Sequence, residues 1–551
     1  LHAQDTGEGK ISQDLNSESE DEISAQDPSP EKAQEAAEKK QSLEELLAVP
    51  FNQIKEEQAL ELGFSEAESS DNVSKSDDGE VKLPPPPQQR KVERDIEKKI
   101  PSYFKLTKIQ TAKISELQKL LKKDEVLLDY YFYEKELKVV SISKDKVEIL
   151  SKKNDFNYLN KLNKELRNTL IPSQGTIKPY AVNKSFILNE KTFLFLNKIT
   201  KNYKNIIVIP DGPLNSMPLH ALAYAKNENC LDCRNIKFNL SKHNFNYFPS
   251  ADSFTSIETI AKDFKKTKYL LSKEKIKIPF KKIKEKIGKL VKKDKSSKLK
   301  KVEINNLFYL GIGDPDLYSK IESTKISEED KITMLRSLFD TEVINSEIIK
   351  KIYGPVDGSA DEIEQVAKYL SPLKSKLLLR EDAKELNLKE LDLSSYKIIH
   401  FATHGEISGA LEGINEPFLV LSPPSSTSNE DGLLTMSEIM SLDTNADLVV
   451  LSACNTASGD EIGSEGFSGL AKSFFMSGSK SILVSNWYVE TYSAKEIVIN
   501  LFKNIKNNNN LTVSKALNLA MLDMAKNQKD RSHPLFWAPF VVVGKNQSLS
   551  F

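Results

Sequence analysis

Two stretches decide the fold of this chain: Lys397-Ile-Ile-His-Phe-Ala-Thr-His-Gly405 and Asp447-Leu-Val-Val-Leu-Ser-Ala-Cys-Asn-Thr456. Each is an apolar run that leads into a reactive side chain, His404 in the first stretch and Cys454 in the second. Continuous apolar runs bounded by turn residues are typical of buried strands in a parallel sheet. In open α/β sheets, chemistry gathers beyond the carboxyl ends of such strands. The sequence therefore predicts an imidazole and a thiol at neighbouring strand ends.

A cysteine nucleophile needs an acid/base partner, and the two stretches supply both. Taken singly, a Cys after a strand is usually a small core residue, and a lone His is usually structural. Here His404 precedes Cys454 by about fifty residues, the spacing that caspases show. Gly405 permits close approach of the backbone to a ligand, so the N–H groups of Gly405 and Cys454 are predicted to form an oxyanion hole.

These stretches, "HFATHGE" and "LVVLSACNTASG", resemble the CHAT domain, a caspase-like clan CD cysteine peptidase family related to the separases. The likeness covers roughly residues 125 to 545, and further blocks follow in the family's order: Ile206–Tyr224, Phe308–Leu317, Arg380–Lys389, Asp431–Ile439, Glu465–Val489 and His533–Gly544. The resemblance implies a caspase-like α/β/α sandwich whose catalytic unit follows a degenerate, pseudo-caspase α/β unit. It also implies a regulatory partner of the tetratricopeptide-repeat or sensor type, although no such repeat is visible in this chain.

Composition divides the chain into four parts. Residues 1–95 are acidic, Ser-rich and poor in aromatic residues, which predicts a disordered tail. Residues 96–260 are expected to form the degenerate half, in which Asp211 reads as a turn residue. Residues 261–303 are a lysine-rich insertion, and residues 304–551 are expected to form the catalytic half. Alternating strands and helices in both halves predict a mostly parallel sheet covered on both faces.

The lysine-rich segment Lys262–Lys301 has three interpretations. It is a solvated insertion, a patch for phosphate, nucleic acid or a membrane surface, or a docking surface for the acidic tail of the same chain. The first is favoured over nucleic-acid binding, because aromatic residues for base stacking do not alternate with the lysines. If the tail does lie on the insertion, it would limit access or activation, and salt would weaken that contact.

Cys230 and Cys233 form a CxxC pair in "ENCLDCRN". The pair is half of a zinc site, a redox pair, or a coincidence in a loop, and the coincidence is favoured because a second set of paired ligands is missing. His400 and His404 are unsuited to shared metal ligation, since residues four apart on a strand lie about 13 Å apart. His400 is expected to support its strand, and no metal or cofactor is predicted.

Substrate binding is predicted at Ser485, Asn486 and Trp487, which leave a strand beside the expected site, and at Asp431. Caspase-like folds pair an extended substrate with such a segment. Trp487 reads equally as a core residue, and Asp431 equally as a turn former. Some relatives with basic specificity carry an Asp two residues before the nucleophile; Ser452 stands there, so a preference for Lys or Arg has no support from that position.

The sequence thus predicts a cysteine endopeptidase acting on a specific protein substrate through Cys454 and His404. The alternatives are a non-catalytic scaffold with the same fold and, less favoured, a thiol oxidoreductase using its CxxC pair. The sequence contains no run of eighteen apolar residues, so no membrane span is expected. A cytoplasmic location is favoured, and export is the alternative if Leu1-His-Ala3 is the remnant of a signal peptide.

Overall fold

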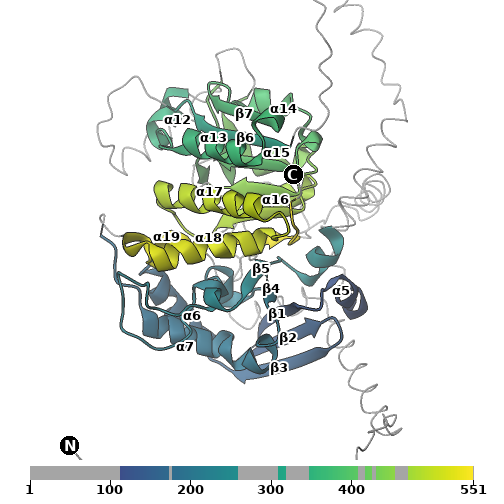
Figure 1. Cartoon of the computed structure of the whole chain (residues 1–551), viewed down its shortest axis with the longest axis vertical. Helices are drawn as coiled ribbons and strands as arrows, with labels where there is room; N and C mark the ends of the chain where they lie inside the picture. The colour runs from purple at the N-terminus through teal and green to yellow at the C-terminus, as the bar shows by residue number, and fades with distance from the viewer. Residues whose placement is uncertain are drawn as a thin grey trace, which may run out of the picture. The chain divides into compact units, whose positions relative to one another are not determined.

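Eleven strands form a single mixed sheet in the computed structural model, in the order β3-β2-β1-β4-β5-β14-β13-β12-β8-β6-β7 (Figure 1). The structure describes residues 112–133, 135–172, 176–257, 308–317, 346–406, 416–424, 430–452 and 469–549. The predicted tail, the lysine-rich insertion and Cys454 lie outside these ranges.

The first part of the chain contributes one end of the sheet. Its strands are β1 Glu125–Tyr133, β2 Glu136–Ser143, β3 Val147–Lys153, β4 Asn205–Ile209 and β5 Asn244–Tyr247. β1, β2 and β3 form an antiparallel meander, whereas β1, β4 and β5 run parallel. The α-helices bounded here are α5 Ile114–Leu120, α6 Phe156–Arg167, α7 Val182–Thr192 and α8 Asn197–Thr200.

The second part is doubly wound. Its strands in the main sheet are β6 Tyr309–Pro315, β7 Ser375–Arg380, β8 Ile398–Ala402, β12 Leu448–Leu451, β13 Ser481–Ser485 and β14 Phe540–Gly544. All but β14 run parallel to their neighbours in this part. The helices are α12 Ser346–Tyr353, α13 Ser359–Leu370, α14 Glu385–Lys389, α15 Met436–Ser441, α16 Gly469–Met476, α17 Thr491–Asn507, α18 Val513–Asn527 and α19 Pro534–Trp537. The predicted α/β fold, with its large, mostly parallel sheet and covering helices, is confirmed.

The chain reverses direction across the sheet at β13 and β14, which pair antiparallel. β14 then joins the first part through the Val543–Tyr247 pair with β5 and through a 2.7 Å hydrogen bond from Asn246 Nδ2 to the Gly544 carbonyl. Because of this reversal, the carboxyl ends of β4 and β5 lie at the opposite edge from those of β8 and β12. Asp211 follows β4 at that opposite edge. Its carboxylate accepts hydrogen bonds from the backbone N–H groups of Phe132 and Gly212, both at 2.8 Å, so it stabilises a turn as the sequence predicted.

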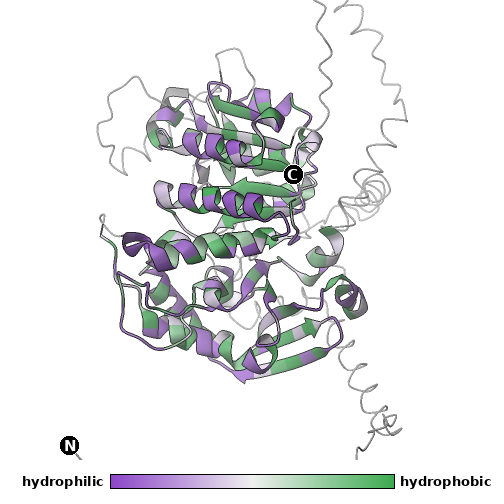
Figure 2. Ribbon diagram, viewed as in Figure 1, coloured by the Kyte–Doolittle hydropathy of each residue, from purple (hydrophilic) through white to green (hydrophobic). Residues whose placement is uncertain are grey.

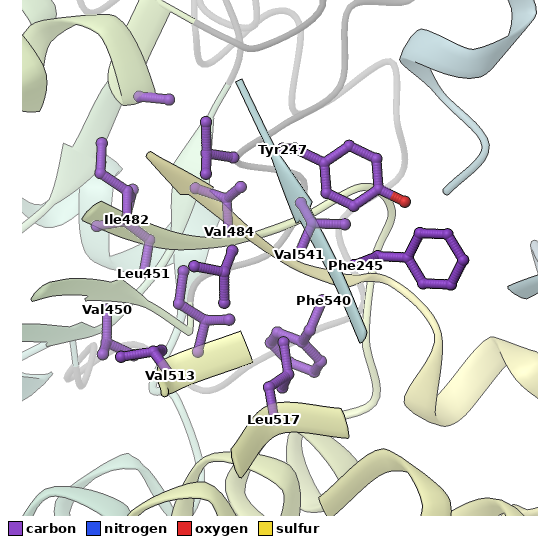
Figure 3. Close-up of a cluster of buried hydrophobic side chains, with 14 of the residues drawn as sticks. Phe245, Tyr247, Val450, Leu451, Ile482, Val484, Val513, Leu517, Phe540 and Val541 are labelled. Atoms are coloured by element: carbon purple, nitrogen blue, oxygen red, sulfur yellow. The ribbon is translucent and has the colours of Figure 1, made fainter. Parts of the chain in front are cut away.

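The helices are amphipathic, and their apolar faces make the core. In α13 the buried apolar residues recur at helical spacing, at Ile363, Val366, Ala367 and Leu370. α13, α17 and α18 lie side by side (Figure 1), and each carries both hydrophobic and hydrophilic residues (Figure 2). Figure 3 shows side chains of α18 and of the strands β5, β12, β13 and β14 meeting in this core.

A second, three-stranded antiparallel sheet follows β8 directly. It consists of β9 Gly405–Glu406, β10 Phe418–Val420 and β11 Leu433–Thr435, in the order β11-β10-β9. α15 begins after β11 with a capping box, in which Thr435 and Glu438 satisfy each other's backbone N–H groups. Among the described residues, no helix combines the length and hydropathy that a bilayer crossing needs.

Candidate active site

His404 stands two residues beyond the carboxyl end of β8, at the edge where chemistry was predicted. From β6 the chain goes to β7 on one side of the sheet, and it then returns to β8 and β12 on the other side of β6, so the order reverses between β6 and β8. This is a topological switch point, the usual position for a site in an open α/β sheet. Ser452, the residue after β12, donates its backbone N–H to the Phe401 carbonyl at 3.1 Å, which fixes the two strand ends side by side.

The ring of His404 is held by the end of α12. Its Nε2 lies 3.2 Å from the carbonyl oxygen of Gly354, and its ring packs on Tyr353 with centroids 5.6 Å apart. A carbonyl oxygen can only accept, so Nε2 carries the hydrogen and Nδ1 of the neutral ring keeps its lone pair. Burial lowers the pKa of His404, and hydrogen bonds to the backbone carbonyls of Gly354 and Tyr353 offset part of that effect. The neutral imidazole is therefore favoured, with Nδ1 as the proton acceptor.

Gly354 can offer its carbonyl because of its backbone conformation. It has φ of +64°, and its N–H bonds to the Lys350 carbonyl at 3.1 Å, so it ends α12 in the left-handed region that glycine adopts most readily. This turn directs the last carbonyl of the helix end toward His404.

The backbone around His404 is fixed by the small sheet. Val420 N donates to the His404 carbonyl at 2.9 Å, and the Thr403 hydroxyl donates to the Val420 carbonyl. Gly405 pairs with Leu419 in β9 and β10. The imidazole is thus positioned from two sides, by α12 through its ring and by β10 through its backbone.

A buried polar network lies beneath the site. His400 is fully buried, and its Nδ1 and Nε2 lie 2.9 Å from the hydroxyl of Tyr309 and from Oε1 of Glu362, respectively. Ser452 Oγ lies 3.3 Å from the same Nε2. Burial, together with the charge of Glu362, raises the pKa of Tyr309 well above its ordinary value. The network joins α13 to β6, β8 and β12, in agreement with the structural role predicted for His400.

The model of the CHAT domain family matches residues 188–545, more than half of the sequence. The chain belongs to the CHAT domain family. Among solved structures, the Saccharomyces cerevisiae separase–securin complex is similar over 79% of this chain and 31% of that chain, with 9% identity and a TM-score of 0.37. This chain therefore spans less than a third of that separase–securin chain. The Arg-specific cysteine proteinase gingipain R is similar over 71% of this chain and 74% of its own, with 10% identity and a TM-score of 0.33. None of the curated proteins compared matches the chain.

The predicted substrate-binding residues of this CHAT domain occupy two different environments. Ser485, Asn486 and Trp487 are all buried, and the Trp487 indole donates to the Leu535 carbonyl at 3.1 Å. The neighbouring Tyr488 is 60% exposed, so this segment presents that ring to solvent while Trp487 packs in the core. Asp431 accepts from the backbone N–H of Leu433 at 2.7 Å as a turn former, and burial raises the pKa of its carboxyl.

Arg167 is a residue that the sequence analysis missed. It ends α6, and its guanidinium donates to the carbonyls of Ser216 and Asn486 and lies 5.7 Å from the ring of Trp487. It thereby links the first part of the chain to the segment after β13. The supporting contacts of Gly354 and Tyr353 were missed as well, because they lie some fifty residues upstream of His404 in sequence.

Cys230 and Cys233 are joined in a disulfide, so the interpretation as a coincidence in a loop is wrong. Disulfide sulfurs are not the thiolates that zinc requires, and shared zinc ligation is incompatible with this state. Cys233 is fully buried, and its N–H donates to Ser532 Oγ at 2.8 Å. The disulfide closes the loop on itself, and the backbone hydrogen bond from Cys233 connects this loop to the segment that precedes α19.

Proposed function

We propose that this CHAT domain protein is a cysteine endopeptidase that hydrolyses peptide bonds of a protein substrate with Cys454 and His404. The observation that carries the proposal is the register of the two strands. Each residue of β12 pairs with the residue fifty positions earlier in β8, as in Leu448–Ile398 and Leu451–Phe401. Cys454 likewise follows His404 by fifty positions in the sequence. Neighbouring strands lie about 4.8 Å apart, within reach of a hydrogen bond between side chains.

The orientation of His404 suits the general base of such a dyad. Its Nε2–H is engaged by the Gly354 carbonyl, so Nδ1 is the nitrogen left to take the thiol proton. When that proton arrives, the ring becomes an imidazolium, and the same carbonyl stabilises it through a charge-assisted hydrogen bond. The backbone carbonyl thus orients the imidazole, which in other hydrolases is the task of a carboxylate.

The reaction proceeds in two halves. His404 accepts the thiol proton, the sulfur of Cys454 bonds to the carbonyl carbon, and the carbonyl oxygen takes the negative charge. The backbone N–H groups of Gly405 and Cys454 are the donors proposed to hold that oxygen. The C–N bond then breaks as the imidazolium protonates the amine, leaving a thioester. Water, deprotonated by His404, attacks the thioester and releases the acid and the thiol.

An extended substrate is proposed to lie along the segment after β13. The predicted residues Ser485, Asn486 and Trp487 are buried, so contact there would involve backbone groups and the exposed ring of Tyr488 rather than these side chains. Asp431 remains a proposed pocket residue. The identity of the substrate side chains is a question for a cleavage profile.

The test uses the small number of thiols in this chain. Of three cysteines, two form the disulfide, so iodoacetamide under non-reducing conditions should label Cys454 alone. Peptide-library cleavage by wild type is expected to disappear in Cys454→Ala and in His404→Ala. His404→Ala should also slow alkylation near neutral pH, because the base that produces the thiolate is gone. Cys230→Ser/Cys233→Ser is the matched control and should retain cleavage.

Cleavage at the wild-type rate by either dyad variant would refute the peptidase assignment. If wild type itself cleaves no peptide in the library, and alkylation of Cys454 is as slow as that of a free model thiol, the non-catalytic scaffold becomes the better description.

A further inference from the structure

The segment that joins β13 to α17, residues 486–490, is tied to the residues just before β14. The backbone N–H and the side-chain amide of Asn486 both donate to the carbonyl of Pro539, at 2.9 and 3.2 Å. The indole of Trp487 donates to the carbonyl of Leu535. At its far end, the carboxylate of Glu490 caps the first turn of α17. The backbone of this segment therefore has a defined course where it leaves the sheet.

Arg167 adds a contact from a distant part of the chain. It is the last residue of α6, and its guanidinium donates to the carbonyls of Asn486, at 3.3 Å, and of Ser216. The guanidinium carbon also lies 5.7 Å from the centroid of the Trp487 ring, within the range of a cation–π interaction. Arg167 precedes residue 188, where the match to the family begins, so this contact comes from outside the matched region.

The type of side chain suits this position. A guanidinium is a planar group with five N–H donors in a fixed arrangement, so it can serve two carbonyls and lie against an aromatic ring at the same time. The ammonium of a lysine is a compact charge without that planar arrangement. Arg167 therefore makes three contacts that one lysine could not reproduce together.

The contact with Asn486 fixes the direction of a whole peptide unit. The carbonyl of Asn486 belongs to the same planar unit as the N–H of Trp487, and in a trans unit these two groups point in opposite directions. Both backbone polar groups of Asn486 have partners within the protein. Pairing with a substrate backbone is therefore expected at the residues that follow, where Tyr488 is 60% exposed. The orientation of those residues depends on the unit that Arg167 holds.

We propose that Arg167 is a positioning residue for substrate binding, acting through the segment after β13 rather than on the reacting groups. The inference rests on the proposed peptidase function, and it gives a role to the first part of the chain, which contributes neither dyad residue. An extended substrate that pairs with a strand-like segment depends on the geometry of the backbone that it meets. Loss of the guanidinium should weaken substrate binding and leave the chemical step to Cys454 and His404.

The kinetic test compares wild type with Arg167→Met and Arg167→Lys, using a peptide that wild type cleaves. Arg167→Met keeps an apolar stem but removes every donor. Its KM should rise on the order of tenfold with kcat within about twofold, because the lost affinity is shared by the ground and transition states. Arg167→Lys should show an intermediate KM, since an ammonium can still bind one of the two carbonyls. Lys164→Met changes an exposed residue one turn earlier in α6 and should leave KM unchanged.

Two measurements separate positioning from a purely structural role. Hydrogen exchange at the backbone N–H groups of residues 486–490 should be faster in Arg167→Met than in wild type, while exchange in β8 stays the same. Iodoacetamide is too small to need the segment, so its reaction with Cys454 should keep the wild-type rate. Lower stability with unchanged KM and unchanged exchange in residues 486–490 would overturn the proposal. Equal losses in kcat and in the alkylation rate would also overturn it, because Arg167 would then support the dyad itself.

Failure of the peptidase proposal gives a different result. If wild type cleaves its peptide and Arg167→Met has the same KM, the role of Arg167 is refuted and the peptidase function stands. If wild type cleaves no peptide in the library, both proposals fail. Faster exchange in Arg167→Met would then identify Arg167 as a structural link between α6 and the segment after β13.

Discussion

Glu362→Leu alone should destabilise the protein more than a triple variant that replaces all the main polar side chains around His400 together. In the native state Glu362 Oε1 lies 2.9 Å from His400 Nε2, and the two side chains are 4% and 0% exposed. Without the carboxylate, Nε2 keeps only Ser452 Oγ at 3.3 Å, and that hydroxyl already contacts the Phe401 carbonyl. Breaking a buried pair by removing one partner typically costs about 3–5 kcal/mol in unfolding free energy.

The triple variant Tyr309→Phe/Glu362→Leu/His400→Leu tests the cause. It removes each polar group together with its partner, so no buried donor or acceptor remains unpaired, and its loss should be smaller than that of Glu362→Leu by at least about 1 kcal/mol. The matched control, Glu364→Leu, lies on the exposed face of the same helix and should change stability by less than about 0.5 kcal/mol.

Urea unfolding followed by tryptophan fluorescence measures these changes. The chain has two Trp residues, Trp487 and Trp537, and both are buried, so their emission reports on the core. A loss below about 1 kcal/mol in Glu362→Leu would refute the reasoning. So would a triple variant at least as unstable as the single one, because the cost would then come from packing and not from the unpaired imidazole.

Three further results are expected. Gly354→Ala should lower stability by about 1 kcal/mol and also reduce kcat, because the carbonyl that orients His404 shifts. The control Gly358→Ala introduces the same left-handed strain, at φ +79°, and should lower stability without changing kcat. Equal kcat values in the two variants would contradict this reasoning. Burial lowers the pKa of His220 to about 4. As pH falls below about 6.5, the imidazole is therefore protonated in the unfolded state before it is protonated in the folded state. The free energy of unfolding should drop by up to about 1.4 kcal/mol per pH unit until pH approaches 4. Urea titrations at pH 7 and 5 measure this drop, and a slope unchanged in His220→Gln would assign it to other groups. Cys230→Ser/Cys233→Ser should cost about 2 kcal/mol through loss of the short disulfide loop, and a melting temperature equal to wild type would contradict a structural role.

Local sequence pattern was enough to predict the elements that carry the site. The apolar runs before His404 and before Ser452 are β8 and β12. Residues 360–370, 494–504 and 513–528, predicted as helices from the sequence, lie in or coincide with α13, α17 and α18 to within a few residues. These features could be predicted because the period of a helix and the burial of a central strand are recorded in consecutive residues. The other stretches that resemble the CHAT domain family allowed the fold of a long part of the chain to be predicted from local sequence as well.

Strands with weak local signals were not predicted. β3, Val147–Lys153, alternates partly buried and exposed residues, and β9, β10 and β11 are two or three residues long. Such strands exist because partners distant in sequence supply their hydrogen bonds, and composition does not record those partners. The joining of both halves into one sheet through β5 and β14 likewise depends on pairing across nearly three hundred residues.

The sequence alone determined the kinds of residue present and the strand ends that they follow: an imidazole after one buried strand and a thiol after the next. Tertiary structure alone decided what surrounds them. It gave His404 a backbone carbonyl from Gly354 and gave His400 a carboxylate from Glu362. The physical reason is that hydrogen bonding and burial depend on which distant segments meet, whereas periodicity reports only which face of an element is apolar.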